Sequence, residues 1–467
     1  MARQSGGEEA QKNLHAAWDE MIRDFEEARN GIDQLDLMPA TQNDRNIAEG
    51  YRYLMGYVHA AVERAFHTDR AQPQFRNALS IITRSTIDNP DAIYFYAPIN
   101  GRETYLLRGE VGDARHWRGA TAAPTGRKAP HYMIFETTWG VLPGDSGDLA
   151  ELRPGTKSQI GRLDSSKIEV SDDGSFEILL APERPEGYTG NFVSTLKVVH
   201  HPHPTDASVP PERYAHFLSG RQLFNDWNRE DVVYFDMVQV GAEGEPSEAY
   251  SPERALEEIR ECGLIVKNQM IFWNAFWTIL MGTYGEREGS IPGVAFPRND
   301  FNTMNAASGA TGGGMSTNLY AGGIAELGPD EAFIIENRIH LQPQYIGFQL
   351  GNLWGESIEY ANRVGSRNGH QSHVDDDGVI RLVVAHKDPG VQNWLDTSGH
   401  PEVFMSPRWA YSETPEPDQW PTISGKKVKF SEIRSHLAAN TPEYSAEQRR
   451  DEIALRQRRV RKRFRVF

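Results

Sequence analysis

The feature that most constrains this fold is an internal repeat, in which "DDGSFEILLAPERPEGYTGNFVST" (172–195) resembles "DDGVIRLVVAHKDPGVQNWLDT" (376–397). The shared positions form an Asp-Gly turn, a proline and, after a two-residue slip, an Asn-aromatic-aliphatic-x-Thr signature: Asp173, Gly174, Pro185, Asn191, Phe192, Val193 and Thr195 against Asp377, Gly378, Pro389, Asn393, Trp394, Leu395 and Thr397. An earlier block agrees, since 91–109 aligns without a gap to 331–349. One matching block can arise by chance in any β protein. Two blocks in the same order predict a duplicated β unit whose copies fold alike.

The length of the chain agrees with two such units. At 467 residues the chain exceeds the size at which a single core stops growing. Short β-type runs separated by Gly, Pro and Asp turns dominate beyond residue 88. We therefore predict a mainly β fold with helical additions, in which two tandem jelly-roll-like antiparallel β-sandwiches accompany N-terminal and central helical segments. The predicted parts are an N-terminal helical segment (1–85), the first sandwich (86–210), a helical insertion with a Gly-rich connector (211–325), the second sandwich (326–425) and a basic helical tail (426–467).

Two helices are expected within the N-terminal segment, each with one buried apolar stripe at helical spacing. The expected stripes are Leu14, Trp18, Ile22 and Phe25 in the first helix and Ile47, Tyr51, Leu54, Val58 and Val62 in the second. Helical texture is also expected across 211–285, and the Gly-rich stretch 305–318 is interpreted as a lid or connector.

The charge of the chain argues against nucleic-acid or membrane binding by its body. A formal net charge of -16 is opposite to what phosphate binding requires. The tail is the exception, because "RRDEIALRQRRVRKRFRVF" (449–467) holds nine basic residues against Asp451 and Glu452. Docking of this tail on the acidic body or on a sister subunit is favoured, so a homo-oligomer is predicted. A nucleic-acid or lipid arm is the alternative.

The cysteine content and the termini indicate a cytoplasmic protein. The single cysteine, Cys262, cannot form an intramolecular disulfide. The start "MARQSGGEEAQKN" lacks the apolar region of a secretory signal. The most apolar run, 264–281, contains Lys267 and three amide side chains, so it predicts a buried core helix instead of a membrane span.

Two segments resemble known families of unknown function. "DNPDAIYFYAPI" (88–99) resembles the Asn-x-Asp-x-x-Tyr motif of the DUF1254 family. "NLWGESIEYANRVGSRN" (352–368), with the Asp-Gly turn, Pro-Gly, Asn-Trp-Leu and "FMSPRW" that follow it, is similar to the DUF1214 family. The second resemblance covers roughly 330–415. It implies paired β-sandwiches with helical additions and supplies no chemistry.

Histidines suggest one weak metal hypothesis. In "VVHHPHPTD", His201 and His203 project to the same face of an extended chain, a spacing that can bind a divalent ion. Pro202 and Pro204 instead favour an exposed exit from a strand, where the histidines are solvated. In "GHQSHVDDDG" (369–378) the acidic residues before a glycine are typical of a turn. We therefore predict no cofactor and no metal, with His201/His203 as the weaker alternative.

The residues carried by the resemblance form the candidate site. Asp91, Tyr94 and Arg363 are the predicted catalytic residues. The predicted substrate-binding residues are aromatic walls and polar anchors of a cavity between the sandwich sheets: Asn89, Trp354, Tyr360, Asn362, Asn393, Trp394, Arg408 and Trp409. The structural alternative is that Asn89 and Asn393 bond backbone at strand ends, Trp394 is a core residue and Arg363 is a buried partner of Asp91.

Three functional hypotheses follow from this set. The preferred one is a bacterial catabolic enzyme, a hydrolase or lyase, acting on an aromatic or lipid-like small molecule. The others are a non-catalytic sandwich that binds a carbohydrate or lipid, and a structural oligomer. A buried titratable pair in a pocket would favour catalysis. A shallow groove with aromatic residues on an outer sheet face would favour binding.

Overall fold

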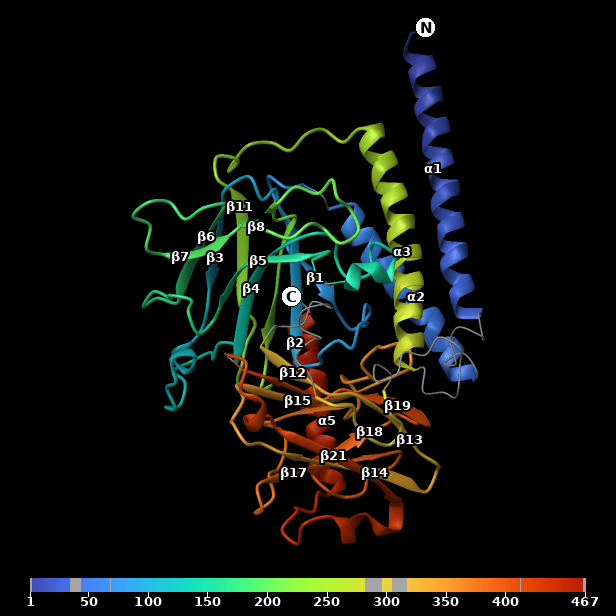
Figure 1. Ribbon diagram of the computed structural model, residues 1–467, viewed down its shortest axis with the longest axis vertical. Coiled ribbons are helices and arrows are strands. Elements are labelled where there is room, and N and C mark those ends of the chain that lie inside the picture. The colour runs from blue at the N-terminus through green and yellow to red at the C-terminus, as the bar shows by residue number, and fades with distance from the viewer. Residues whose placement is uncertain are drawn as a thin grey trace. The chain divides into compact units, whose positions relative to one another are not determined.

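The computed structural model describes residues 2–33, 43–67, 69–153, 155–281, 296–304, 317–411 and 413–464, so most of the predicted Gly-rich connector lies outside the described residues. The chain forms two compact units (Figure 1). The first unit comprises Met1–Thr83, Ile93–Leu223 and Asp231–Ala275, and the second comprises Arg84–Ala92, Phe224–Glu230 and Phe276–Phe467. Two short excursions of the chain, 84–92 and 224–230, therefore belong to the second unit although the first unit surrounds them in sequence.

The first unit contains a β-sandwich. One sheet has the order β1-β2-β10-β4-β5 and the other β11-β3-β6-β7. The strands are β1 (Arg76–Leu79), β2 (Ala92–Pro98), β3 (Tyr105–Glu110), β4 (Tyr132–Trp139), β5 (Ser158–Asp164), β6 (Ser175–Ala181), β7 (Asn191–Ser194), β10 (Phe217–Leu223) and β11 (Tyr234–Gln239), with the small pair β8 (Leu196–Val198) and β9 (Glu212–Tyr214) beside them. Both sheets contribute inward residues to one core, among them Phe95, Leu107, Phe135 and Ile178. Alternation of buried and exposed residues along β6 produces this arrangement.

The second unit repeats this architecture. Its sheets have the orders β12-β20-β15-β19-β13, with β16 paired to β15, and β18-β17-β14-β21. The strands are β12 (Asn318–Tyr320), β13 (Gly323–Glu326), β14 (Glu331–Arg338), β15 (Tyr345–Gly351), β16 (Ser366–Asn368), β17 (Val379–Ala385), β18 (Trp394–Asp396), β19 (Glu402–Met405), β20 (Arg408–Ala410) and β21 (Thr422–Lys429). Phe333, Phe348, Leu382 and Trp409 lie in the core between the two sheets.

The four-stranded sheets of the two units match in strand order and in register. In the first, β6 runs parallel to β7 with Leu179 opposite Phe192. In the second, β17 runs parallel to β18 with Val383 opposite Trp394. These are the pairs that the sequence repeat aligns. The predicted duplication therefore corresponds to one topology built twice.

The earlier alignment block is wrong in register. The antiparallel partner of β6 is β3, with Tyr105 opposite Leu180, whereas the partner of β17 is β14, with Phe333 opposite Val384. Thus β14 is the counterpart of β3 and not of β2, which lies in the other sheet. Residues 91–109 and 331–349 matched because consecutive strands of any sandwich alternate apolar and polar residues in the same way.

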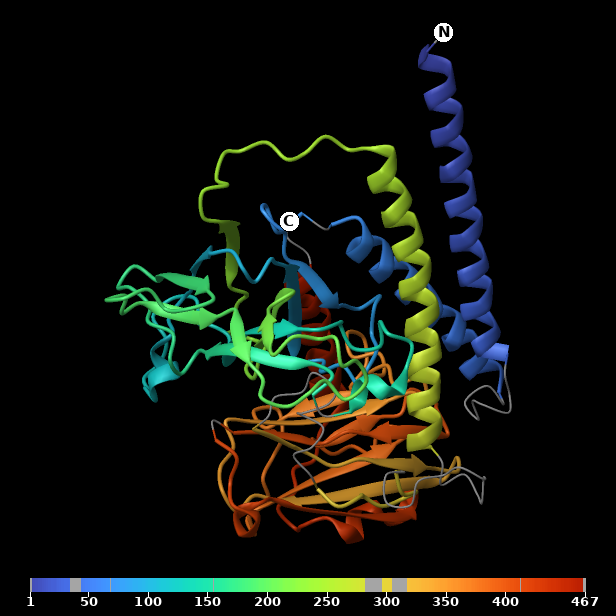
Figure 2. The same cartoon turned by 45° about the horizontal axis from the view of Figure 1, so that its top comes forward.

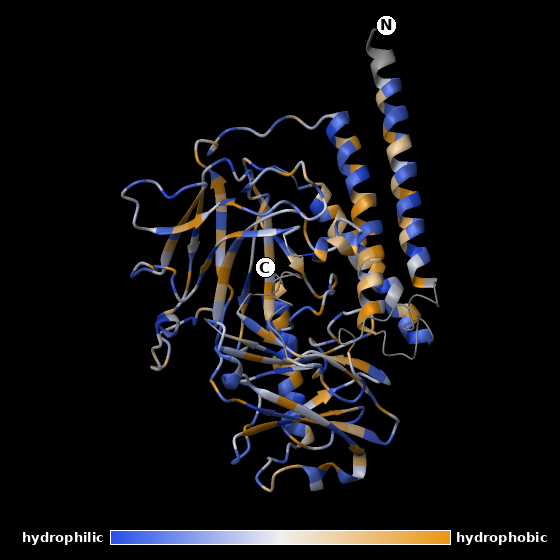
Figure 3. Cartoon of the chain, viewed as in Figure 1, coloured by the Kyte–Doolittle hydropathy of each residue, from blue (hydrophilic) through white to orange (hydrophobic). Residues whose placement is uncertain are grey.

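The helices of the first unit are α1 (Ala2–Asp33), α2 (Asp44–Ala65) and most of α3 (Pro252–Leu280). Figures 1 and 2 show α1 and α3 running side by side, and the Lys267 ammonium donates to the Asp24 carboxylate at 2.5 Å between them. Gly263 on α3 lies against Met21 and Asp24, where a Cβ would come within 2.9 Å of α1. Among the described residues, no helix is long and apolar enough to cross a bilayer, and Figure 3 shows hydrophilic residues interspersed along α3.

The predicted stripe of the first helix is wrong, and that of the second is wrong in part, since its Leu54 is buried. On α1 the buried residues are Ala17, Met21, Asp24, Ala28 and Ile32, whereas Trp18 is 55% exposed. On α2, Tyr51 and Val62 of the expected stripe are exposed, and the buried face includes Tyr53, Leu54, Tyr57 and Ala61. On α1 two of the buried positions, Ala17 and Ala28, are small residues that permit close helix packing.

The predicted boundaries also need correction. Segment 211–251 contains β9, β10 and β11 instead of helices, and β10 pairs with β4 along its whole length. The first sandwich therefore extends beyond residue 210, and the second begins with β12 and ends with β21 at Lys429. The aromatic and charged residues of 211–251 resembled helix because their β alternation is interrupted by short turns.

The basic tail forms α5 (Ala446–Phe464) and packs within its own unit. Arg449, Arg456 and Arg463 recur every seven residues and share one helix face. All three are at most 8% exposed. Their guanidinium groups lie over aromatic rings, with Arg463 4.3 Å and Arg456 5.0 Å from the Trp227 ring centre. These arginines therefore stabilise the fold of the second unit by packing against its aromatic rings.

Candidate functional site

Asp91, a predicted catalytic residue, lies at the centre of a closed polar cluster in the second unit. Its side chain accepts hydrogen bonds from the Trp227 indole at 2.6 Å, the Tyr345 hydroxyl at 2.5 Å and the Asn368 amide at 3.0 Å. Asp91 is 2% exposed, and burial raises the pKa of its carboxyl. The cluster thus joins the segment 84–92, the segment 224–230 and the strands β15 and β16 of the second sandwich.

Positive charge is supplied to this cluster by the tail helix. Arg463 donates to the Pro90 carbonyl at 2.7 Å, and its charge lowers the pKa of Asp91 against the effect of burial. The pKa of Tyr345 is raised well above its ordinary value by burial and by the Asp91 charge. The phenol therefore stays neutral and donates a hydrogen bond to Asp91. A carboxylate with three donors and nearby arginines is a structural centre that holds three chain segments together.

Further predicted residues surround this cluster. Asn89 accepts from the Tyr345 hydroxyl at 3.1 Å and from the Asp91 backbone at 3.0 Å. Arg408 donates to the Ile87 carbonyl at 2.9 Å. Tyr360 is buried, and burial raises the pKa of its phenol. Asn89, Asp91, Tyr360 and Arg408 are thus brought together in the same polar region.

The remaining predicted residues are dispersed. Trp409 lies in the sandwich core and donates to Asn337 at 3.3 Å, and Trp354 is also fully buried. Asn393 makes three hydrogen bonds to backbone groups of His373 and Arg381, and the Trp394 indole donates to the Ala385 carbonyl at 3.1 Å. The backbone role for Asn393 and the core position of Trp394 agree with the structural alternative.

Three predicted residues are not members of this cluster. Tyr94 lies on β2 of the first unit, with Arg221 5.4 Å from its ring centre. Asn362 is exposed and bonds Glu359 at 3.0 Å. Arg363 is 52% exposed and pairs with Asp396 at 3.0 Å, so its expected burial beside Asp91 is wrong. The positive charge that acts on Asp91 is that of Arg463 on α5.

The predicted histidine site does not form a metal centre within the described ranges. His203 is half-buried, and its two ring nitrogens meet the Thr156 carbonyl at 3.4 Å and the Asp206 backbone N–H at 3.0 Å. His201 lies on an exposed loop. In the parts of the chain that the structure describes, no group of three His, Cys, Asp or Glu side chains is arranged to hold a metal ion. Cys262 is buried, and burial raises the pKa of its thiol to about 11, which disfavours a nucleophilic thiolate.

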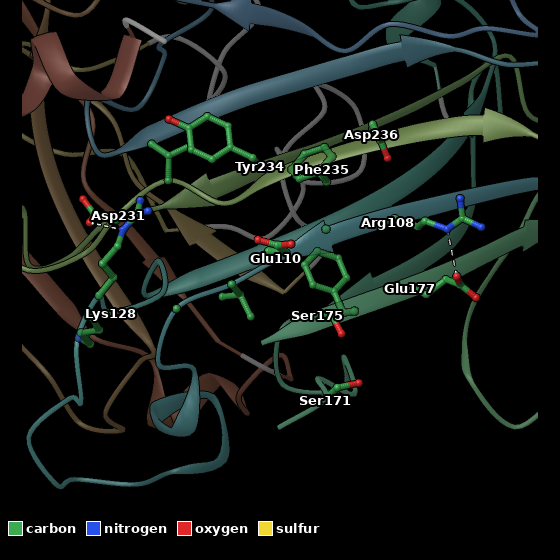
Figure 4. Close-up of a pocket in the computed structure, with 16 residues that line it drawn as sticks. Arg108, Glu110, Lys128, Ser171, Ser175, Glu177, Asp231, Tyr234, Phe235 and Asp236 are labelled. Atoms are coloured by element: carbon green, nitrogen blue, oxygen red, sulfur yellow. Dashed lines mark hydrogen bonds and ion pairs between the residues drawn. The ribbon is translucent and has the colours of Figure 1, made fainter. Parts of the chain in front are cut away.

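An open groove of about 870 Å³ lies in the first unit (Figure 4). Its floor is the outer face of three neighbouring strands, β11, β3 and β6. Cross-strand pairing places Asp236, Arg108 and Glu177 in one row across the sheet. Two residues along, it places Tyr234, Glu110 and Ser175 in a second row. In Figure 4 the Glu110 carboxylate lies between Tyr234 and Ser175.

Loops at the end of these strands form one wall of the groove. The Arg127 guanidinium donates to Asp231 at 2.8 Å, which joins the loop before β4 to the segment before β11. Lys128 follows Arg127 in this wall, and Ser171 lines the groove near Ser175 (Figure 4). On the floor, Arg108 donates to Glu177 at 3.3 Å and lies 3.7 Å from Glu243.

Rigid packing beneath the groove supports these strands. Phe235 and Phe176 are lining residues of the groove, and Phe235 contacts Phe75, Phe95 and Phe135 edge to face. Gly109 lies between them, and a Cβ there would meet the Phe176 ring at 2.5 Å. The glycine therefore leaves room for two rings, and the aromatic core fixes the strands that carry Arg108 and Glu110.

Four polar side chains of the groove are unpartnered within the part of the chain that the structure describes. They are the carboxylates of Glu110 and Asp236 and the hydroxyls of Tyr234 and Ser171. The Tyr234 side chain is 55% exposed, so its ring face is accessible too. Charges in the lining nearly cancel, since three cations (Arg108, Arg127 and Lys128) face four carboxylates (Glu110, Glu177, Asp231 and Asp236). This groove can accept hydrogen bonds from a ligand and pack against an apolar ring face without selecting a strong net charge.

Neither the cluster partners nor the groove were identified from the sequence. Tyr345, Trp227, Asn368 and Arg463 lie far from Asp91 in sequence, and no local motif links them. The groove had a usable signal, since "YLLRGE" places Arg108 and Glu110 at alternate positions of one strand and "YFDMVQ" places Tyr234 and Asp236 at alternate positions of another. Their antiparallel pairing, which brings Arg108 opposite Asp236, requires the tertiary structure.

Comparisons with known proteins bear on the fold alone. An uncharacterized protein from Burkholderia cenocepacia is similar in structure, with a TM-score of 0.70 and 22% sequence identity over 90% of this chain and 99% of that one. The VPA0106 protein from Vibrio parahaemolyticus matches with a TM-score of 0.40 and 12% identity over 81% of this chain and 98% of that one. No family model matches the sequence, and neither does any curated protein. The chain thus shares its mainly β architecture with a solved bacterial protein.

Proposed function

We propose that the first sandwich binds an uncharged polyhydroxylated molecule of the saccharide or polyol class in the groove over β11, β3 and β6. The observation that carries this proposal is the pair of unpartnered carboxylates, Glu110 and Asp236, on the same sheet face as the exposed Tyr234 ring. Ionised carboxylates accept hydrogen bonds from hydroxyl groups on neighbouring carbons. The tyrosine ring offers an apolar face to the C–H groups of a sugar ring.

The volume and charge of the groove support this ligand class. A groove of about 870 Å³ lies within the range that small organic ligands occupy. The nearly balanced charge of its lining gives a neutral ligand no electrostatic penalty. Its openness to solvent suits recognition by a surface more than chemistry that requires water to be excluded. This arrangement favours the binding hypothesis over the enzyme hypothesis.

Isothermal titration with neutral monosaccharides, disaccharides and inositols tests the proposal. We expect at least one compound to bind, and the variants Tyr234→Ala and Glu110→Gln to weaken its binding about tenfold or more, the loss of one buried hydrogen bond or ring contact. Tyr250→Ala is the matched control, because Tyr250 is a similarly exposed tyrosine, 60% accessible, outside the groove lining. Absence of binding by the whole panel, or wild-type affinity in both groove variants, would contradict the proposal.

The other expectations remain predictions. A hydrolase or lyase acting on an aromatic or lipid-like molecule would form product in the same titration mixtures, which chromatography can detect. Sedimentation of the full chain tests whether it forms a homo-oligomer. The cytoplasmic location and the resemblance to the DUF1254 and DUF1214 families are likewise proposals that rest on the sequence patterns.

A further inference from the structure

A second cavity, of about 510 Å³, lies in the second unit. Its walls come from the loop before β15, the loop between β16 and β17, and Asn225 of the 224–230 excursion. The apolar part of its lining consists of aliphatic side chains, a proline and one phenol ring: Ile339, Pro343, Tyr345, Ile346, Val374 and Ile380. The walls therefore differ in character from the charged groove of the first unit.

The polar part of this lining carries no lysine, arginine, aspartate or glutamate. It consists of Asn225, Gln342, Gln344 and the imidazoles of His340 and His370. The Asn225 carbonyl groups are already used, since its side-chain oxygen accepts from the His370 backbone at 3.4 Å and its main-chain oxygen accepts from Asn368 at 3.0 Å. Its side-chain N–H₂ has no acceptor among the described residues. This group is a fixed donor at the cavity wall.

Histidine side chains supply further hydrogen-bonding groups. The His370 imidazole lies at the cavity with its Nε2 3.7 Å from the Asp226 carboxylate, and its Nδ1 has no partner in the described chain. The imidazole of His340 is likewise without a partner there. A ring bearing one donor and one acceptor could therefore bond to the rim while its faces contact the isoleucines.

We infer that this cavity is a second ligand site, which binds an uncharged aromatic molecule carrying one or two hydrogen-bonding groups, such as a phenol or an indole. The lining combines apolar side chains with a comparable number of uncharged polar groups, which suits a small uncharged ring that carries its own hydrogen-bonding groups. Fixed charge is absent from the lining, so a carboxylate or ammonium ligand would lose hydration without gaining an ion pair. The inference concerns the second sandwich and is independent of the saccharide proposal for the first.

Gly369 provides a direct way to fill the cavity. A Cβ at this lining position would sit 3.5 Å from Ile346, an ordinary contact, and the backbone conformation does not require glycine. Gly369→Leu should therefore keep the fold and occupy the space of the ligand. Val374 is 49% exposed at the same cavity, so Val374→Trp offers a second filling variant that leaves the core unchanged.

Ligand-observed NMR and calorimetry with phenol, indole and benzoate test the inference on the full chain. We expect phenol or indole to bind with a dissociation constant on the order of a millimolar, as small fragments do, and benzoate to bind at least tenfold more weakly. Both filling variants should lose this binding, whereas Glu110→Gln in the other groove should retain it. Absence of phenol and indole binding, or unchanged affinity in correctly folded Gly369→Leu and Val374→Trp proteins, would overturn the inference. If Gly369→Leu fails to fold by circular dichroism, Val374→Trp alone decides the result.

Discussion

The outer face of the four-stranded sheet is open in the first sandwich and covered in the second. In the second, Ala332, Ile334, Val383 and Trp394 project outward and are buried under Ile433 and neighbouring residues. The covering residues come from the short helix η5 (Phe430–His436) and the loops around it. In the first, the equivalent face carries the groove with exposed Tyr234. One topology thus supports a buried packing face in one copy and an accessible ligand face in the other.

The same contrast holds at matched charged positions. Because Tyr105 corresponds to Phe333, Arg108 corresponds to Glu336, and the repeat alignment pairs Glu177 with Arg381. In the second sandwich Arg381 donates to Glu336 at 2.8 Å, to Asp375 at 2.8 Å and to Asp377 at 2.7 Å. In the first, the matched Arg108 and Glu177 form a single half-exposed pair at 3.3 Å, and their neighbours Glu110 and Asp236 have no partner within the described residues. Polar groups whose hydrogen bonds are satisfied within the protein stabilise the fold. Polar groups at a groove that lack a protein partner are available to a ligand.

The largest expected effect on stability comes from removing a buried carboxylate that is fully hydrogen-bonded within the protein. Asp91→Ala should lower the free energy of unfolding by about 3–5 kcal/mol, because it leaves buried donors and the nearby Arg463 charge uncompensated. Glu110→Ala, which removes an unpartnered carboxylate, should leave the free energy of unfolding essentially unchanged. Urea denaturation followed by tryptophan fluorescence measures both. Equal losses of unfolding free energy in the two variants would contradict the distinction between carboxylates bonded within the protein and carboxylates free to bind a ligand.

The second effect is a pH dependence of the second sandwich. Asp88 accepts hydrogen bonds from the Ser357 backbone at 2.8 Å and the Ser357 hydroxyl at 2.7 Å, and burial raises the pKa of its carboxyl to about 6. Between pH 4 and 6 the unfolded chain loses this proton while the native state keeps it, so stability falls as the pH rises. The loss should approach about 3 kcal/mol by pH 7, from a shift of about two pKa units.

Asp88→Asn isolates this contribution. The variant has no ionisable group at position 88, so the free energy of unfolding of the wild type minus that of the variant should decrease from pH 4 to pH 7. Urea titrations at four pH values provide the difference. A difference that stays flat, or that increases with pH, would show that Asp88 is ionised in the native state throughout this range.

The sequence predicted the repeated parts of the fold better than the site. The Asp-Gly turns and the Asn-aromatic-aliphatic-x-Thr signature identified the β6–β7 and β17–β18 units, because an Asn that bonds backbone and an apolar alternation are local requirements. Strand alternation without such a marker led to the wrong register for β2 and β14. Asp91 was predicted as a catalytic residue, and the structure places it in a buried polar cluster whose other members come from four distant segments. The groove depends on which strands become neighbours, which local patterns do not specify.

A smaller effect is expected from the charge pair at matched positions. Arg381→Met should lower the free energy of unfolding by about 2 kcal/mol, because it leaves the buried Asp375 carboxylate with one fewer donor. Thr441 still donates to Asp375 at 2.8 Å, which moderates the loss. Glu177→Gln at the matched position should change stability little, since Glu177 and its partner Arg108 are both about half exposed, at 52% and 51%. Thermal unfolding of both variants at low salt provides the measurement.

The smallest expected effect on stability concerns a feature that the two sandwiches share, an asparagine that bonds to the backbone of neighbouring segments. Asn191 bonds the Glu169 backbone N–H and the carbonyls of Glu169 and Glu177, each within 2.9 Å. Asn393 makes the same three bonds to the equivalent His373 and Arg381. Asn191→Ala and Asn393→Ala should each cost about 1–2 kcal/mol of unfolding free energy, because each leaves backbone groups without their amide partner.

The comparison of the two asparagine variants matters more than either value. Asn362→Ala, at an exposed asparagine of the second unit, is the control and should be nearly neutral. Similar losses at Asn191 and Asn393 would mean that the duplicated β6–β7 and β17–β18 units retain the same energetic design although their outer faces have diverged. A loss at only one of them would mean that matching geometry no longer implies matching stabilisation. In that case the openness of the first sheet face would reflect a weaker scaffold as well as unpartnered side chains.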